Sequence, residues 1–146
     1  MKKNILVSAC LLGESCRYDG KSKPCERVIA LKDTYNLIPV CPEVMGGLPT
    51  PRVPSEICGE RVLMKDGRDV TENYNRGAQT ALEIARQNAC TVAILKEKSP
   101  SCGSGAIYDG SFSGTLTHGD GVAAALLKAH GIRVVGESEI TNGILK

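Results

Sequence analysis

Tryptophan is absent from this 146-residue sequence, and only one phenylalanine and four tyrosines supply aromatic rings. A planar ligand therefore has few side chains to stack on, and Tyr18 and Tyr108, both in predicted loops, are the candidates. No stretch approaches the ~20 apolar residues of a membrane-spanning helix. A net charge of +2 also lacks the basic excess typical of nucleic-acid binding. The length of the chain suits a single domain over residues 1–146. The absences favour a small-molecule partner, with neither a membrane nor a stable nucleic-acid partner.

The amino terminus lacks a signal peptide in its usual form. The sequence opens with two lysines and a short apolar run, but Glu14, Cys16 and Arg17 follow soon afterwards. The apolar run is too short for a signal-peptide core and is better interpreted as a first β-strand. We therefore expect a cytoplasmic protein.

The seven cysteines are the most unusual part of the composition. An odd number of cysteines cannot all pair within one chain, and in a cytoplasmic protein metal or redox chemistry is a strong alternative to disulfides. No two cysteines are spaced as Cys-x-x-Cys, which argues against zinc-ribbon, thioredoxin-type and ferredoxin-type sites. Any metal site must therefore be assembled by the fold.

Hydrophobic patterns alternate between strands and helices along the chain. Strands are predicted over residues 4–9, 37–41, 91–95 and 132–135, with helices over 24–33, 70–88, 120–130 and 137–145. The helix over 70–88 has Asp69 and Glu72 in a capping arrangement. Residues 42–54, with four prolines, and residues 96–119, rich in glycine and serine, predict long shaped loops. A hairpin over 57–65 is expected to close at Lys65-Asp66-Gly67.

This alternation predicts a parallel sheet covered by helices on both faces. The expected fold is a small three-layer α/β domain, Rossmann-like, with a hairpin insertion. Ligands of such sheets bind beyond the carboxyl ends of the strands. Residues that follow different strands therefore meet at one edge.

Three cysteines lie just beyond predicted strands: Cys10, Cys41 and Cys102. A site with three thiolates favours an iron–sulfur cluster or Zn²⁺ and leaves one metal position open. The alternative is that these cysteines are small buried hydrophobic residues. Cys16 shares a loop with Cys10 and is either a fourth ligand or a nearby thiol. Cys25, Cys58 and Cys90 are expected to be structural.

Polar residues near these thiols are candidates for catalysis and binding. Glu43 follows Cys41 by two residues, and a carboxylate beside a metal can act as general acid or base. Ser99 and Ser101 precede Cys102 and can hydrogen-bond a substrate, although Ser-Pro-Ser is also common in turns.

The loops also carry residues that could orient a polar planar ligand: Arg17, Tyr18, Asp19 and Arg52. Arg52 could instead fix its own loop by bonding carbonyl oxygens. The two histidines suggest no Cys-His catalytic pair, because His118 precedes a turn and His130 a helix end.

The chain contains several distinctive strings: SACLLG at residues 8–13, CRYDG at 16–20, CPE at 41–43, GGLPTPR at 46–52, KSPSCG at 98–103, GDGV at 119–122 and GI at 131–132. These strings resemble those of the short bacterial thiouracil desulfidase family, long catalogued as a domain of unknown function. The resemblance spans nearly the whole chain.

The resemblance implies an enzyme with a [4Fe-4S] cluster held by Cys10, Cys41 and Cys102. Substrate sulfur, from a thio-heterocycle such as 2-thiouracil, would bind the open iron, which acts as a Lewis acid without net redox change. Glu43 would activate water or transfer a proton, with Ser101, or else Ser99, positioning the ring. Sulfide would then be released.

Two other interpretations stay open from the residues alone. One is a non-catalytic cluster module that senses redox state or carries sulfur, which would not need Glu43 or Ser101. The other is a structural Zn²⁺ site with Cys16 as the fourth ligand. The physiological substrate and the oligomeric state are not predicted.

Overall fold

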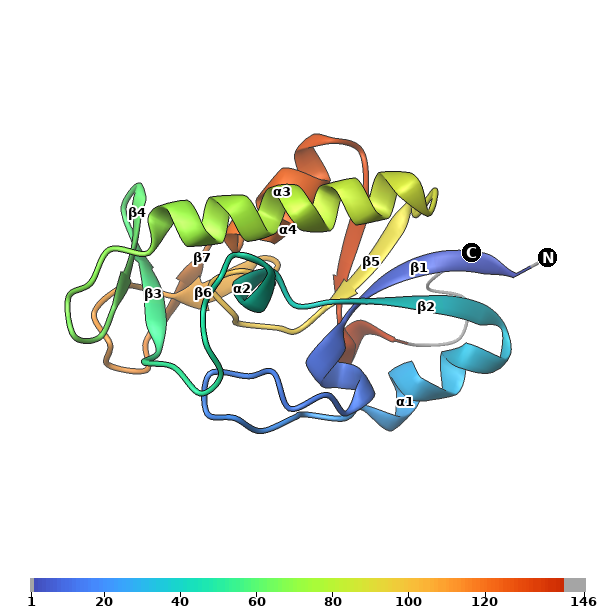
Figure 1. The fold of residues 1–146 in the computed structure, drawn as a ribbon, viewed down its shortest axis with the longest axis horizontal. Coiled ribbons are helices and arrows are strands. Elements are labelled where there is room, and N and C mark those ends of the chain that lie inside the picture. The colour runs from blue at the N-terminus through green and yellow to red at the C-terminus, as the bar shows by residue number, and fades with distance from the viewer. Residues whose placement is uncertain (1, 141–146) are drawn as a thin grey trace.

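A parallel four-stranded sheet forms the centre of the computed structural model, which describes residues 2–140 (Figure 1). The strand order is β2-β1-β5-β8. Their bounds are β1 (Lys3–Ser8), β2 (Tyr35–Val40), β5 (Val92–Leu95) and β8 (Arg133–Gly136). All four correspond to predicted strands, with ends that differ by at most two residues.

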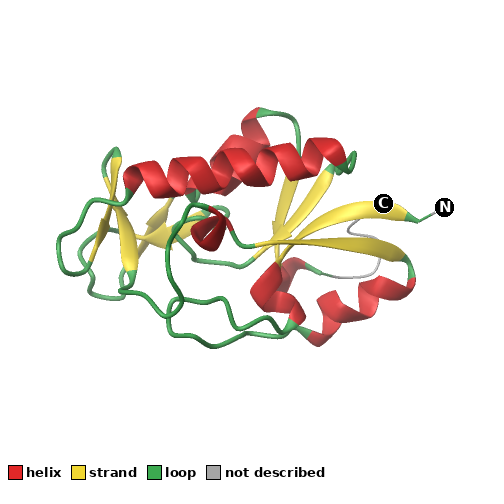
Figure 2. Ribbon diagram, viewed as in Figure 1, coloured by secondary structure: helices red, strands yellow, loops and turns green. Residues whose placement is uncertain are grey.

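Helices cover both faces of this sheet (Figure 2). On one face lie α3 (Thr71–Gln87) and α4 (Val122–Ala129). On the other lies α1 (Glu26–Ile29), with the 3₁₀ turns η1 (Ala9–Leu12) and η2 (Ala30–Asp33). Leu6 packs in the cluster under α3 and α4, whereas Ile5 and Val7 pack in the opposite one. The predicted three-layer α/β architecture is confirmed.

Two hairpins stand beyond the carboxyl ends of the strands (Figure 1). They are β3 (Ser55–Cys58) with β4 (Arg61–Met64), and β6 (Ala106–Tyr108) with β7 (Leu116–His118). The first was predicted, but its expected closure at residues 65–67 is wrong. Its strands reverse at Gly59, whose φ of 62° lies in the left-handed region that glycine favours. Asp66 and Gly67 form a separate turn after β4.

Several other local predictions needed correction. The second hairpin interrupts residues 96–119, which were expected to be a loop. Residues 42–54 begin with one helical turn, α2 (Pro42–Met45), because proline is well suited to a first helical position. The helix expected from residue 24 begins at Glu26 because Cys25 is extended.

The start of α3 and the last predicted helix also differ from the expectation. Val70 occupies the N-cap position of α3 without a side-chain capping bond, and Asp69 accepts hydrogen bonds from Thr71 rather than forming the expected capping arrangement. Of the last predicted helix, the structure contains the 3₁₀ turn η3 (Glu137–Glu139), and residues 141–145 lie outside the described residues. Among the helices of residues 2–140, none is long and apolar enough to cross a membrane.

Candidate active site

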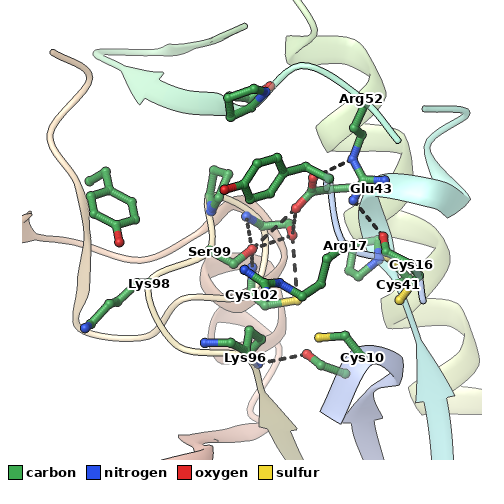
Figure 3. Close-up of a pocket in the computed structure, with 18 of the residues that line it drawn as sticks. Cys10, Cys16, Arg17, Cys41, Glu43, Arg52, Lys96, Lys98, Ser99 and Cys102 are labelled. Atoms are coloured by element: carbon green, nitrogen blue, oxygen red, sulfur yellow. Dashed lines mark hydrogen bonds and ion pairs between the residues drawn. The ribbon is translucent and has the colours of Figure 1, made fainter. Parts of the chain in front are cut away.

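A pocket of about 520 Å³ lies beyond the carboxyl ends of β1, β2 and β5 (Figure 3). The three cysteines expected at this edge line it: Cys10 from η1, Cys41 between β2 and α2, and Cys102 from the loop after β5. Cys16 lines the same pocket. All seven cysteines of the chain are free thiols. The fold therefore gathers in one place thiols that are up to 92 positions apart in the sequence.

The backbone around each of these thiols is held by hydrogen bonds. Gly13 and Lys23 donate N–H groups to the carbonyl oxygen of Cys10. Cys41 lies at the N-cap of α2. The first N–H groups of α4 have no partner within the helix, and those of Ala123 and Ala124 bond the carbonyl oxygen of Ser101. The loop that carries Cys102 is thus attached to the start of a helix.

The thiols differ in exposure and in their neighbours. Cys10 and Cys102 are buried, whereas Cys16 and Cys41 are partly buried. The Cys16 side chain contacts both Cys10 and Cys41, and the Cys41 Sγ lies 3.7 Å from the carbonyl oxygen of Cys16. Among residues 2–140, no three His, Cys, Asp or Glu side chains are close enough to hold one metal ion.

The surroundings of Cys16, Cys41 and Cys102 favour the neutral form of their thiols in the metal-free protein. Hydrogen bonding with Cys10 raises the pKa of the Cys16 thiol to about 11. Hydrogen bonding with Cys16, followed by burial, raises the pKa of Cys41 well above its ordinary value. Burial raises the pKa of Cys102 to about 12, although hydroxyl groups of Ser8 and Ser101 act in the opposite direction. Thiols bind metals as thiolates, so loading a metal group here releases protons.

Glu43 lies on the wall of the pocket and is joined to both predicted serines. Its Oε2 accepts hydrogen bonds from Ser101 Oγ at 3.0 Å and from Ser99 Oγ at 3.4 Å. The two serine hydroxyls are 3.0 Å apart, and Ser101 Oγ also lies 3.6 Å from the sulfur of Cys102. The carboxylate, the hydroxyls and one thiol therefore form a connected polar network.

The two serines have different surroundings within this network. Ser99 Oγ accepts the backbone N–H groups of Ser101 and Cys102, each at 3.2 Å, and so fixes the turn. Ser101 is 2% exposed and its hydroxyl makes its contacts with other side chains. Ser101 is thus the better placed of the two to act on a bound molecule.

The guanidinium of Arg52 holds neighbouring segments of the chain in place through its hydrogen bonds. Its Nε donates to Glu43 Oε1 at 3.0 Å, and Nη2 donates to the carbonyl oxygen of Cys16 at 2.9 Å. Nη1 donates to Pro49 O and Thr50 Oγ1, each at 3.1 Å. Of the two roles considered for Arg52, these contacts favour fixing the loop over direct binding of a ligand.

Of the other predicted binding residues, Arg17, Tyr18 and Tyr108 line the pocket and Asp19 does not. Tyr18 is 42% exposed, lines the pocket and has the Arg17 guanidinium 5.9 Å from its ring centre. Tyr108 lines the pocket from β6. Asp19 is not a lining residue and instead pairs with Arg17 at 3.7 Å.

Two residues of the site had no functional role in the sequence interpretation. Tyr74, assigned to the packing face of α3, is 1% exposed, and Ser55 and Glu43 both influence the pKa of its phenol. Burial, aided by the charge of Glu43, raises the pKa of Tyr74 well above its usual range. Ser8, the last residue of β1, is also buried and lines the pocket. Its position at a strand end was the signal that could have identified it.

Comparisons with known proteins agree with the motifs. Residues 5–139 match a family model described as 2-thiouracil desulfurase. Uncharacterized protein YbbK of Bacillus subtilis (strain 168) is 45% identical over 148 aligned positions, which cover 94% of this chain and 98% of that protein. The solved structure of [4Fe-4S]-dependent thiouracil desulfidase TudS matches with a TM-score of 0.90 and 48% identity. That match covers 95% of this chain and 93% of the TudS chain.

Proposed function

The chain belongs to the 2-thiouracil desulfurase family, and we propose that it is a desulfidase that replaces the sulfur of a thiocarbonyl heterocycle, such as 2-thiouracil, with oxygen from water. We further propose that Cys10, Cys41 and Cys102 hold a [4Fe-4S] cluster, the cofactor on which the similar enzyme TudS depends. The sulfur leaves as hydrogen sulfide.

One observation carries the assignment of these residues: three free thiols, each following a different strand of one sheet, line a pocket that also contains Glu43. Thiolates are the protein ligands that iron–sulfur clusters use. Three thiolates leave one iron without a protein ligand. When bound, the cluster would supply there a soft Lewis acid suited to a thiocarbonyl sulfur.

Glu43 is proposed to be the catalytic acid and base. A carboxylate can take a proton from water while the water oxygen attacks the thiocarbonyl carbon, and can then deliver that proton to the leaving group. Arg52, on Oε1, fixes the carboxylate and leaves Oε2 on the side of Ser99 and Ser101. Arg52 thus orients the group that transfers the proton.

The serines and the aromatic residues are proposed to position the substrate. The Ser101 hydroxyl lies between Glu43 and Cys102, where it can hydrogen-bond a polar edge of the ring. Ser99 holds the turn that presents Ser101. Tyr18, a partly exposed lining residue, offers a ring face for stacking.

We place the reaction in the cytoplasm. Seven free cysteines are expected in a compartment that keeps thiols reduced. Exclusion of oxidants would also preserve thiolates that bind a metal cofactor.

The test begins with purification of the protein without oxygen and quantification of iron, acid-labile sulfide and zinc. A cluster of this type requires about four irons and four sulfides per chain. Uracil and sulfide are then measured after addition of 2-thiouracil. The expected result is stoichiometric release of both products by the loaded protein.

Cys41→Ser is the test variant and Cys58→Ser is its matched control. Cys58 lies outside the pocket lining, and its thiol donates to the carbonyl oxygens of Glu56 and Gly110, contacts that serine can keep. The Cys41 variant should lose iron and turnover, whereas the Cys58 variant should keep both. Zinc without iron in the wild-type protein, or iron retained without Cys41, would contradict the assignment.

A further inference from the structure

A second buried carboxylate, that of Glu56, lines the pocket with Glu43. Glu56 belongs to β3 and is 9% exposed. Whereas Glu43 bonds the side chains of Arg52 and the serines, Glu56 bonds the backbone of another segment. Burial of a carboxylate is costly unless it is hydrogen-bonded, so the partners of Glu56 indicate its role.

Both partners of Glu56 belong to the loop that joins β6 to β7. Its Oε1 accepts the backbone N–H groups of Gly110 at 2.9 Å and of Phe112 at 3.2 Å. This loop spans residues 109–115 and is closed at its base, where the Asp109 N–H donates to the carbonyl oxygen of Thr115 at 2.9 Å. One carboxylate oxygen therefore attaches the loop to β3.

Further contacts hold the loop 109–115 against β3, and the strands β3 and β6 lie side by side (Figure 1). The Cys58 thiol donates to the carbonyl oxygen of Gly110 at 3.5 Å. A Cβ at Gly110 would lie 2.8 Å from the carbonyl oxygen of Ile57, so this approach requires glycine. Phe112 has a φ of 56°, which is uncommon for a bulky residue and persists where the surroundings hold it. The first hairpin thus sets the conformation of the loop.

The loop brings the only phenylalanine of the chain to the pocket. Phe112 is partly buried and lines the pocket, as does Gly114 from the same loop. The phenylalanine side chain has no polar atom, so it can offer a ligand only an apolar ring. Such a surface suits a planar heterocycle.

We propose that Phe112 contacts the ring of the bound heterocycle, and that Glu56 is a positioning residue that holds Phe112 in place for this contact. The inference rests on the proposed function, because it concerns how the substrate of that reaction is held. A contact made equally with the substrate and the transition state lowers KM and leaves kcat unchanged. The loop therefore acts on KM.

The first measurement is hydrogen exchange of the loop 109–115 in the metal-free protein. Glu56→Met keeps the length of the side chain but removes the acceptor, whereas Glu56→Gln keeps an acceptor oxygen. We expect the loop amides to exchange about tenfold faster in Glu56→Met and at the wild-type rate in Glu56→Gln. Glu56→Ala is a second replacement without an acceptor and should behave as Glu56→Met does. Glu60→Met, at the exposed turn of the same hairpin, is the control and should leave this exchange unchanged.

The second measurement is thiouracil turnover by the anaerobically loaded protein. Phe112→Ala should raise KM about tenfold, the effect of losing one aromatic contact with a base, while iron content stays constant. Glu56→Met should also raise KM. Because Glu56 acts through Phe112, adding Glu56→Met to Phe112→Ala should raise KM no further. Glu56→Gln should restore the KM of the wild type.

The outcomes separate this inference from the proposed function. Wild-type exchange of the loop in both Glu56→Met and Glu56→Ala would overturn the role of Glu56. An unchanged KM in Phe112→Ala would overturn the contact with the substrate, and a further rise in KM in the double variant would show that Glu56 does not act through Phe112. Loaded wild-type protein without turnover would contradict the proposed function and the substrate contact together. The exchange measurement needs no cluster and tests the attachment of the loop in either case.

Discussion

Glu43 and Arg52 form an ion pair that is almost entirely shielded from solvent. The Nε of Arg52 lies 3.0 Å from Oε1 of Glu43, and the two side chains are 3% and 14% exposed, respectively. Through its other donors Arg52 also reaches Cys16 and the proline-rich loop. One guanidinium therefore connects three segments of the pocket wall.

Arg52→Ala should destabilise the metal-free protein strongly. Removing one partner of a buried ion pair leaves the other charge uncompensated and costs about 3–5 kcal/mol. The control is Arg68→Ala, because Arg68 pairs with Asp66 at 2.9 Å but both side chains are largely exposed. Such a surface pair contributes about 0–1 kcal/mol. Urea unfolding under reducing conditions measures both changes, and equal losses would show that Arg52 does not have this structural role.

Glu43→Gln should abolish most turnover while the cluster remains. Glutamine keeps the size of the side chain but cannot take up the proton, and loss of general acid–base catalysis lowers rates by about 10²–10⁴-fold. Thiouracil turnover and visible absorption are measured on the same sample. Glu14→Gln, at an exposed position of the first loop, is the control. Turnover at the wild-type rate in Glu43→Gln would remove this carboxylate from the mechanism.

Gly77→Ala should destabilise the protein, although alanine in a helix is usually favourable by about 1 kcal/mol relative to glycine. A Cβ at Gly77 would lie 1.7 Å from the carbonyl oxygen of Pro42, so α2 would have to move away from α3. Because α2 follows Cys41 and contains Glu43, cluster content should also fall. The control is Gln79→Ala on the exposed side of α3. Thermal unfolding and iron analysis measure both effects, and a more stable Gly77→Ala variant would contradict this close contact.

Asp120→Asn should cost stability near neutral pH but little in acid. Burial acts to raise the pKa of Asp120, but the Lys128 ammonium and the Gly105 N–H, at 2.9 and 2.8 Å, outweigh it and lower this pKa below its ordinary value. A lowered folded-state pKa stabilises the fold above the unfolded-state pKa of about 3.9, and this stability is lost as pH falls through the folded-state pKa.

Unfolding curves from pH 6 to pH 3 provide the measurement for Asp120. The difference in unfolding free energy between wild type and Asp120→Asn should shrink as the pH falls. Glu60→Gln, at the exposed turn between β3 and β4, serves as the control. A difference that stays constant or grows in acid would contradict the proposed stabilisation of the carboxylate.

Local sequence signals located the central sheet but misplaced the turn of the first hairpin and missed the second hairpin. The apolar runs of the central sheet are unambiguous, because both faces of a parallel sheet are covered and its strands are continuously hydrophobic. The first hairpin offered two glycine turns, at Gly59 and Gly67, and the sequence interpretation chose the wrong one. The second hairpin was missed because β7 is exposed throughout and has no hydrophobic alternation to reveal it.

The sequence by itself determined the family, the alternation of the four central strands with helices, and the three cysteines that follow strands. Parallel strands place their carboxyl ends at one edge, so that convergence follows from topology alone. Only the tertiary structure decided the partners of Arg52 and Ser101. Each reaches an atom from a separate segment, at a distance that depends on how strands, helices and loops pack, and no local pattern in the sequence encodes such distances.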